Sequence, residues 1–336
     1  KEKLGECLVT TIDLSGASIT EGKEGMKTKA NELPAGLFSG AKGLTKACLP
    51  KDITAISKNC FYGCSNLVTI PIPDGVKEIG NAAFKNCEAL VAISLPADLS
   101  TIGSEAFEGC KSLKAIEVPA SVSKMGSQTF NGCKALTTAN ILATVSEIPS
   151  EAFNNCTSLS TINLPAGVNK IGSDAFSNCE ALANVTLPES VSELGNGAFE
   201  DCKNLSTIQM ASVAKLGNNA FEGCKSLKSV TFGNLTSLGS DAFKDCLSLA
   251  EANVPGTYKT VGDEAFAGCT SLKKIVLPAT VKQIADEAFK NCQSLADFQM
   301  PEAIEKIGSN AFENCTTLRE AILPNTLKKL GSAAYM

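Results

Sequence analysis

The sequence contains no histidine and no tryptophan, and only 5% of its residues are aromatic. Without histidine, the chain lacks the side chain that most often serves as a general base or metal ligand at neutral pH. Charge is also sparse, with 19% charged residues and a net charge of -5 at pH 7. Lysines and acidic residues are interspersed, so no basic stripe is present to neutralise a phosphate backbone. These deficits argue against hydrolase triads and against nucleic acid as a partner.

Long apolar runs are absent as well. No stretch approaches the roughly eighteen consecutive apolar residues of a membrane helix, so we expect no membrane insertion by this chain. The first residues, KEKLGECLVTTIDLSG, lack the charged and then apolar layout of a signal peptide. Because the chain begins at Lys1, we interpret it as a processed product or a fragment whose targeting and anchoring segments lie elsewhere.

What the sequence does contain is a strict repeat. Phenylalanine recurs every 23 residues, with two steps of 22, and Tyr335 occupies the next expected place. Three residues after each phenylalanine but the first comes a cysteine, from Cys64 to Cys315. One unit reads A-F-x-x-C-x-x-L-x-x-I-x-L-P-x-x-V-x-x-I-G-x-x-A-F. The phenylalanines are Phe38, Phe61, Phe84, Phe107, Phe130, Phe153, Phe176, Phe199, Phe221, Phe243, Phe266, Phe289 and Phe312.

Each unit predicts two short extended segments and a turn. L-x-x-I-x-L alternates as a strand does, and the following proline ends it because proline has no N–H for a ladder. V-x-x-I-G is a second extended run, after which glycine allows a turn into a segment whose Ala, Phe and Cys have helix-like spacing. A unit this small cannot bury its apolar residues alone, so the units must stack, at about 4.8 Å per strand, and share one core.

The pattern therefore predicts a repeat solenoid, with a parallel β-sheet on one side and short strands, turns or short helices on the other. Since the turn side is bulkier, we expect a right-handed horseshoe with the strands on its concave face. Residues 1–37 depart from the repeat and are interpreted as an N-terminal cap segment. Residues 38–336 form a solenoid of about 13 repeats, interpreted as truncated at the C-terminal end because no polar cap follows.

The repeats resemble the BspA-like class of leucine-rich repeats, found on the surfaces of mucosal bacteria and of some parasitic protists. The motif C-x-x-L-x-x-I-x-L-P-x-x-V-x-x-I-G-x-x-A-F carries this resemblance over residues 38–335. The resemblance implies a cell-surface or secreted protein that acts in adhesion or in binding host molecules. The matching positions are structural, so they imply a fold and identify no ligand.

The fifteen cysteines allow three interpretations. Metal ligands must converge, whereas the repeated thiols should form a line. Disulfides need Cα atoms about 4.4 to 6.8 Å apart, which stacking nearly satisfies, but each interior cysteine would have two equivalent neighbours. We favour the third interpretation, in which cysteine fills a small buried position, as Ala41 does in the first repeat. Cys48 is different because it falls on the strand face, which makes it the most reactive candidate thiol.

No residues have the spacing of a catalytic or cofactor site. The carboxylate pairs Glu200 with Asp201 and Asp263 with Glu264 fall in polar turns, where solvation explains them. The glycine motifs of dinucleotide and phosphate binding do not occur, and the repeated I-G is interpreted as a turn. We expect no enzymatic activity, no cofactor and no metal.

The candidate ligand-binding site is the outward side of the first strand, because the residues flanking the inward isoleucine point to the concave surface. Short neutral polar groups dominate this side and suit hydrogen bonding to a peptide or a sugar, although solvated Thr and Asn are also usual on exposed sheets. Near the end of the chain the face gains charges of both signs, including Lys274 and Asp297. The candidate residues are Glu117, Thr138, Asn140, Thr161, Asn163, Asn184, Thr186, Thr207, Gln209, Ser229, Thr231, Glu251 and Asn253.

The leading hypothesis is a non-enzymatic recognition or adhesion module that binds a protein or glycan, such as host extracellular matrix or mucin, through this face. The alternative is a rigid spacer that displays another domain of a longer surface protein, which the scarcity of aromatic anchors favours. Both 22-residue steps fall within residues 205–240, where the strands also lose their proline. That irregularity indicates either a ligand notch or a deletion tolerated in a loop.

Overall fold

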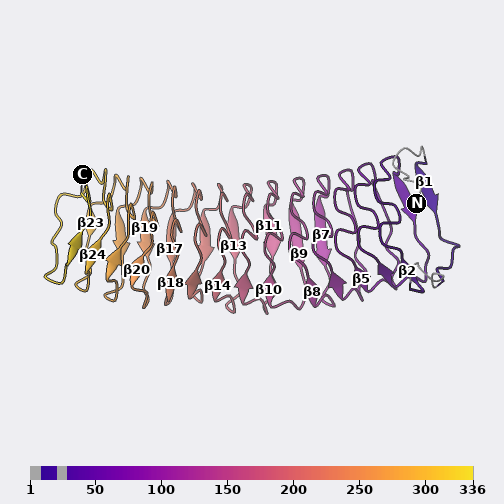
Figure 1. The fold of residues 1–336 in the computed structure, drawn as a ribbon, viewed down its shortest axis with the longest axis horizontal. Coiled ribbons are helices and arrows are strands. Elements are labelled where there is room, and N and C mark those ends of the chain that lie inside the picture. Colours follow the sequence, from indigo (N-terminus) through magenta and orange to yellow (C-terminus); the bar gives the residue numbers. More distant parts are fainter. Residues whose placement is uncertain (1–8, 21–28, 336) are drawn as a thin grey trace. The chain divides into compact units, whose positions relative to one another are not determined.

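The computed structural model of the protein describes residues 9–20 and 29–335. The chain divides into two compact units, Lys1–Gly167 and Val168–Met336. Each unit is a stack of coils, and a typical coil contributes a first strand, a second strand and a run of turns (Figure 1). The described residues contain no helix, so the segment with helix-like spacing forms turns. Part of the predicted cap, residues 1–8 and 21–28, lies outside the described ranges.

Among the described residues, the first unit contains eleven strands, and they pair in parallel with strands of neighbouring coils. Its first strands are β1 (Thr11–Asp13), β3 (Lys46–Cys48), β7 (Ala115–Val118), β9 (Thr138–Ile141) and β11 (Thr161–Asn163). Its second strands are β2 (Glu32–Leu33), β4 (Ala55–Ile56), β5 (Glu78–Ile79), β6 (Thr101–Ile102), β8 (Lys124–Met125) and β10 (Glu147–Ile148).

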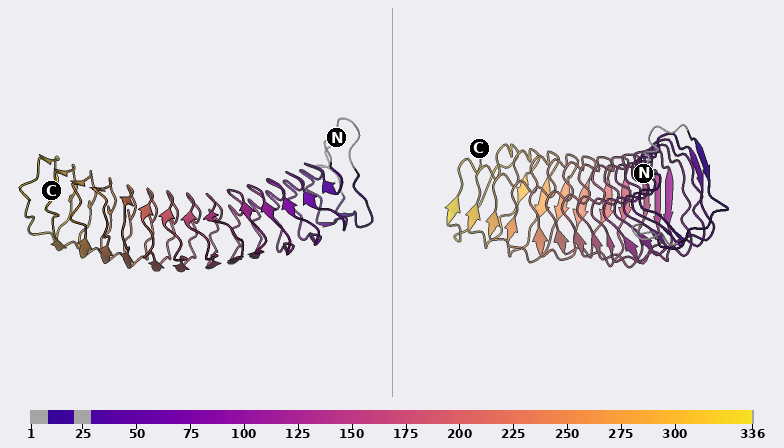
Figure 2. Two further views of the ribbon diagram at one scale, coloured as in Figure 1. Left: turned by 90° about the horizontal axis from the view of Figure 1, so that it is seen from below. Right: turned by 45° about the vertical axis from the view of Figure 1, so that its right-hand side comes forward.

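The second unit repeats this arrangement, and in Figure 2 the arrows of its first and second strands form separate rows. Its first strands are β13 (Asn184–Thr186), β15 (Thr207–Gln209), β17 (Ser229–Thr231), β19 (Glu251–Asn253), β21 (Lys274–Val276) and β23 (Asp297–Phe298). Its second strands are β12 (Lys170–Ile171), β14 (Glu193–Leu194), β16 (Lys215–Leu216), β18 (Ser237–Leu238), β20 (Thr260–Val261), β22 (Gln283–Ile284), β24 (Lys306–Ile307) and β25 (Lys329–Leu330). The predicted solenoid of stacked parallel strands is confirmed.

The row of first strands is interrupted within each unit. Residues 68–72 and 91–95 form no regular strand, and a single bridge joins Lys46 to Thr69. Pro71 stands within this strand pattern, and its missing N–H weakens the ladder there. In the second unit the sheet breaks between β15 and β17, at the first 22-residue step, where only Met210 and Phe232 form a bridge. The second strands β14, β16 and β18 stay paired past that step.

A column of stacked phenylalanine rings fills the core of each unit. In the first unit, the centroids of neighbouring rings lie 5.0 to 5.5 Å apart between Phe38 and Phe153. In the second unit the column ends at Tyr335, which stacks on Phe312 at 5.0 Å and confirms the predicted position of the last repeat. Because each ring packs on the ring of the next coil, the apolar core belongs to neighbouring coils jointly.

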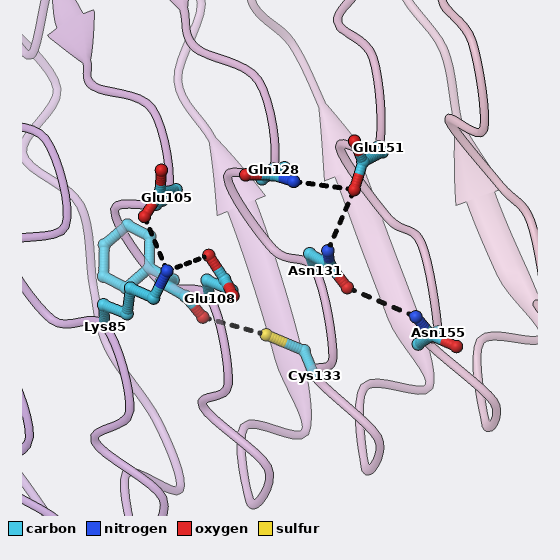
Figure 3. A network of polar contacts seen from close by, with 9 residues as sticks. Lys85, Glu105, Glu108, Gln128, Asn131, Cys133, Glu151 and Asn155 are labelled. Atoms are coloured by element: carbon cyan, nitrogen blue, oxygen red, sulfur yellow. Dashed lines mark hydrogen bonds and ion pairs between the residues drawn. The ribbon is translucent and has the colours of Figure 1, made fainter.

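The cysteine column, defined as the repeated cysteines from Cys64 to Cys315, lies beside these rings. Its described members are buried free thiols, and Ala41 occupies the same buried position in the first repeat, as predicted. Most of these thiols also donate a hydrogen bond to a backbone carbonyl, which the sequence pattern did not indicate. Cys133 Sγ, for example, donates to the carbonyl of Phe107 in the preceding coil at 3.3 Å (Figure 3). Cys224 donates in the same way to Phe199 at 3.1 Å.

Two backbone requirements explain other repeated residues. The residue before each cysteine of the column has a left-handed conformation, as Gly132 (φ 72°) and Asn155 (φ 59°) illustrate. Gly, Asn and Asp are the residues that adopt this conformation most readily, and only they occupy that position. The glycine after the second strand is required for a different reason. A Cβ on Gly80 would lie 2.6 Å from the backbone N of Lys58, so close approach of coils requires it.

Polar side chains on the turn side also join neighbouring coils (Figure 3). The ammonium group of Lys85 lies 2.6 Å from Glu105 and 2.7 Å from Glu108. Two coils further along, Gln128 donates to Glu151 at 2.7 Å. These partly buried contacts link residues about one repeat apart, so they support the same stacking as the core.

The buried thiol of Cys133 provides a test of this packing. Replacing Cys133 with Ala removes one hydrogen bond and a little volume, and should cost about 1–2 kcal/mol. Cys133→Asp places a carboxyl group in a position with 0% exposure and should cost roughly 3–5 kcal/mol. Urea unfolding followed by circular dichroism measures both values. Equal stability of the Asp and Ala variants would contradict the burial described here.

Alkaline pH provides a second test, because burial raises the pKa of the Cys133 thiol from its ordinary value of 9.0 to about 12. Above pH 9.0 the unfolded chain releases this proton while the folded chain retains it, so stability falls as pH rises towards 12. Each such thiol should contribute a slope of about 1.4 kcal/mol per pH unit. Urea unfolding over this range should show a slope smaller by that amount in Cys133→Ala. Identical slopes would refute the burial effect.

Candidate functional site

The strand face, defined as the outward side of the first strands, exposes side chains in two columns within each unit. In β13, for example, Asn184 and Thr186 are exposed while Val185 is buried at 5% exposure. This alternation is the one predicted for residues on either side of the inward position. The inward residues fix the strands in place, and the outward residues are free to vary.

In the first unit, one column forms a ladder of side-chain hydrogen bonds. Asn140 Nδ2 donates to Glu117 Oε2 at 3.0 Å, and Asn163 Nδ2 donates to Asn140 Oδ1 at 2.9 Å. Parallel register places these residues opposite one another, because Glu117 pairs with Asn140 and Asn140 with Asn163. We call these three residues the amide ladder. Thr138 and Thr161 pair in the neighbouring column, and both are exposed.

In the second unit, the predicted residues also pair in register and are exposed. Asn184 lies opposite Thr207, whose hydroxyl donates to Asn184 Oδ1 at 2.6 Å. The other pairs on this face are Thr186 with Gln209, Ser229 with Glu251, and Thr231 with Asn253. The structure thus brings the candidate residues together along each of two faces, one per unit.

Charged residues follow at the end of the second unit's strand face. Lys274 lies opposite Asp297, with Lys273 exposed beside them. Val276 on the same strand is 46% exposed and is the large apolar residue of this part of the face. The face therefore changes from neutral hydrogen-bonding groups to charges of both signs, as the sequence predicted.

The carboxylate pairs in the turns are explained by their contacts within the protein. Burial, followed by the nearby charge of Glu222, raises the pKa of Glu200. Glu264 forms an ion pair with Lys244 at 2.5 Å, and Asp263 accepts a hydrogen bond from the backbone N–H of Asp286 at 3.1 Å. These contacts again connect neighbouring coils.

A cavity of about 850 Å³ at the end of the second unit was not predicted. It lies between β23 with the residues after it and residues 320–326 of the last coil. The available signal was Phe298, which stands where most other repeats have a smaller inward residue. Ile322 on the far side of the cavity is 76% exposed.

Cys48 lies at the end of β3, opposite Asp13 of β1, and is half-buried. The cysteine column, in contrast, is buried, and burial raises the pKa of Cys64 to about 12. We therefore expect maleimide at neutral pH to modify Cys48 much faster than the column thiols, because thiolate and access are both required. Peptide mapping of the folded protein by mass spectrometry measures this order. Modification of Cys64 as fast as Cys48 would contradict it; Cys7 lies outside the described residues.

Comparison with known families agrees with this architecture. The family described as BspA type leucine rich repeat region, whose model spans six repeat copies, matches residues 31–160, 146–273 and 236–336. A comparison with curated proteins finds no match. Among the described residues, none forms a helix long and apolar enough to cross a membrane.

Solved structures give the same result. A leucine-rich repeat protein from Bacteroides ovatus is 28% identical, with a TM-score of 0.71 over 96% of this chain and 83% of that chain. A leucine rich cell surface protein from Faecalibacterium prausnitzii is 27% identical, with a TM-score of 0.56 over 96% and 88% of the two chains. A leucine-rich repeat protein from Eubacterium ventriosum, 18% identical with a TM-score of 0.55 over 94% and 90%, has the same fold.

Proposed function

Because the chain belongs to the BspA-type leucine-rich-repeat family, we propose that it is a recognition module that binds a protein or a glycan through its strand face. The amide ladder is the observation on which this proposal rests. Its side chains are held in one orientation by the hydrogen bonds from Asn163 to Asn140 and from Asn140 to Glu117. An ordered row of amides and a carboxylate loses little side-chain entropy when it binds, since the row is already arranged.

The chemistry of the face favours a polar ligand. Amide, hydroxyl and carboxylate groups both donate and accept hydrogen bonds, which suits a peptide backbone or the hydroxyl groups of a sugar. An extended chain of either kind presents groups at regular intervals, as the ladder does. We propose an extracellular matrix protein or a mucin glycan as the ligand, bound without a cofactor and without catalysis.

A position on the cell surface, or secretion, is part of the proposal. Its support is the Faecalibacterium prausnitzii protein, which is described as a leucine rich cell surface protein and resembles this chain over most of its length.

A rigid spacer is the second candidate function. The observation that favours it is that the strand face carries no exposed aromatic residue in the described part of the chain, where Tyr62 and Tyr335 are the exposed aromatics. Aromatic residues often anchor protein interfaces, so a face without them is less typical of tight binding. A spacer would bind nothing through its own strands.

The double variant Asn140→Lys with Asn163→Lys tests the proposed site. It should bind a hit from an array of matrix proteins, mucins and glycans at least about tenfold more weakly, because it breaks the ladder and adds two charges. Its melting temperature should stay within about 3 °C of the parent, since both residues lie on the surface. Surface plasmon resonance and thermal unfolding measure the two effects.

The matched control is Asn169→Lys with Asn204→Lys, which adds the same charge at exposed positions away from the strand face. The control should bind as the parent protein does. Equal loss of binding in both variants would indicate a general charge effect and would contradict the assignment of the binding site to the amide ladder. Absence of any hit on the array would favour the spacer.

A further inference from the structure

In the last coil of the second unit, the side that would carry the first strand does not pair with the coil before it. Residues 318–324 read L-R-E-A-I-L-P, which is the first-strand pattern, yet they form no strand. In the described part of the chain, no backbone hydrogen bond joins residues 319–323 to β23. The other two sides of this coil pack on the coil before it, because β25 pairs with β24 and Tyr335 stacks on Phe312.

The side chain of Phe298 accounts for the opening. Its ring packs edge-on against Phe289 at 5.3 Å and against Phe312, in the next coil, at 5.0 Å. Phe298 therefore extends beneath the coil that should close over β23. The facing inward residue, Ala321, is exposed and adds no apolar contact that would draw residues 319–323 onto the strand.

The opening leaves β23 as the edge of the sheet formed by β17, β19, β21 and β23. A parallel edge strand carries N–H and C=O groups that point away from its paired neighbour and can bond an added strand. The cavity of about 850 Å³ lies along this edge. Its apolar lining includes Met300, together with Ile322 and Leu323, which are 76% and 40% exposed.

The charged residues that line the cavity are all acidic. Asp297, Glu302 and Glu320 line it, and neither lysine nor arginine does. Among the described residues, none of these three carboxylates forms an ion pair with a lysine or arginine. An occupant with positive charge would therefore be favoured over an acidic one.

We propose that this cavity binds a basic, extended peptide segment, which adds to β23 as a parallel strand. The backbone of the segment bonds the free edge, an aliphatic side chain packs among Met300, Ile322 and Leu323, and flanking lysines or arginines face the carboxylates. The proposal does not depend on the amide ladder, which lies in the first unit.

A synthetic peptide with the sequence of residues 271–280, SLKKIVLPAT, is a suitable probe. It contains two lysines and four large aliphatic residues, two Leu, one Ile and one Val. Its sequence includes that of β21, the strand that β23 pairs with in parallel on its other side. Fluorescence anisotropy of the labelled peptide with the full chain should give a Kd on the order of 10–100 μM. No binding up to the millimolar range would overturn the proposal.

Two variants test the location of the peptide. Glu302→Lys with Glu320→Lys should weaken binding by about tenfold or more, because both carboxylates face the proposed lysines. Glu189→Lys with Asp52→Lys makes the same charge change at exposed positions outside the cavity and should leave the affinity within about twofold. Circular dichroism confirms that both variants fold. Equal affinities in the two variants would overturn the assignment.

Modified peptides and the oligomeric state test the mode of binding. In the register of the native sheet the outward residues donate to the preceding strand, as Asp297 N–H does to the carbonyl of Lys273. Methylation of the backbone nitrogen at the peptide's valine should therefore weaken binding by at least about fivefold if the peptide adds as a strand. Unchanged affinity would rule out strand addition. A dimer that forms in sedimentation velocity and is lost in Glu302→Lys with Glu320→Lys would instead assign the cavity to a second copy of the chain. Loss of peptide binding in Asn140→Lys with Asn163→Lys would move the peptide to the amide ladder and overturn the proposal.

Discussion

Contact between equivalent residues of neighbouring coils is the constraint on which the structure depends. A single coil buries almost nothing by itself, so the rings, the thiols and the backbone all find their partners one coil away. In the first unit the N–H of Phe61 donates to the carbonyl of Ala83 at 2.7 Å. In the second unit Phe221 donates to Ala242 at 2.9 Å. Each repeated residue must therefore fit both the coil before it and the coil after it.

The repeat period, the strand alternation and the register of the strand face follow from the sequence because apolar spacing determines them. Other features depend on three-dimensional distances that spacing does not contain. The glycine after the second strand was interpreted as a turn residue, whereas its main role at Gly80 is to let two backbones approach. The left-handed residue before each cysteine could have been recognised in the sequence, because only Gly, Asn and Asp occupy that position. The motif treated the position as variable. The opening beside β23 depends on where the ring of Phe298 packs, and no one-dimensional pattern specifies that.

Structure and recognition use different positions of the same repeat. Inward residues such as Ile116 and Val230 are nearly fully buried, and their replacement would disturb two coils. The outward residues beside them contact solvent or one another, so the sequence there can change without loss of the core. This separation explains why the family resemblance predicted the stacked-coil fold but did not identify a ligand.

The uniform step between coils has an evolutionary consequence. Since every coil offers its neighbours the same backbone groups and the same ring, duplication or loss of one 23-residue segment leaves the remaining contacts intact. Unequal recombination can therefore lengthen or shorten such a gene in whole coils, and each event adds or removes one rung of exposed side chains. The two 22-residue steps show that the stack also tolerates the loss of a single residue from a repeat, because β14, β16 and β18 keep their pairing there. A lineage could in this way match the length of its binding surface to the length of its ligand, while point mutations set the chemistry of each rung.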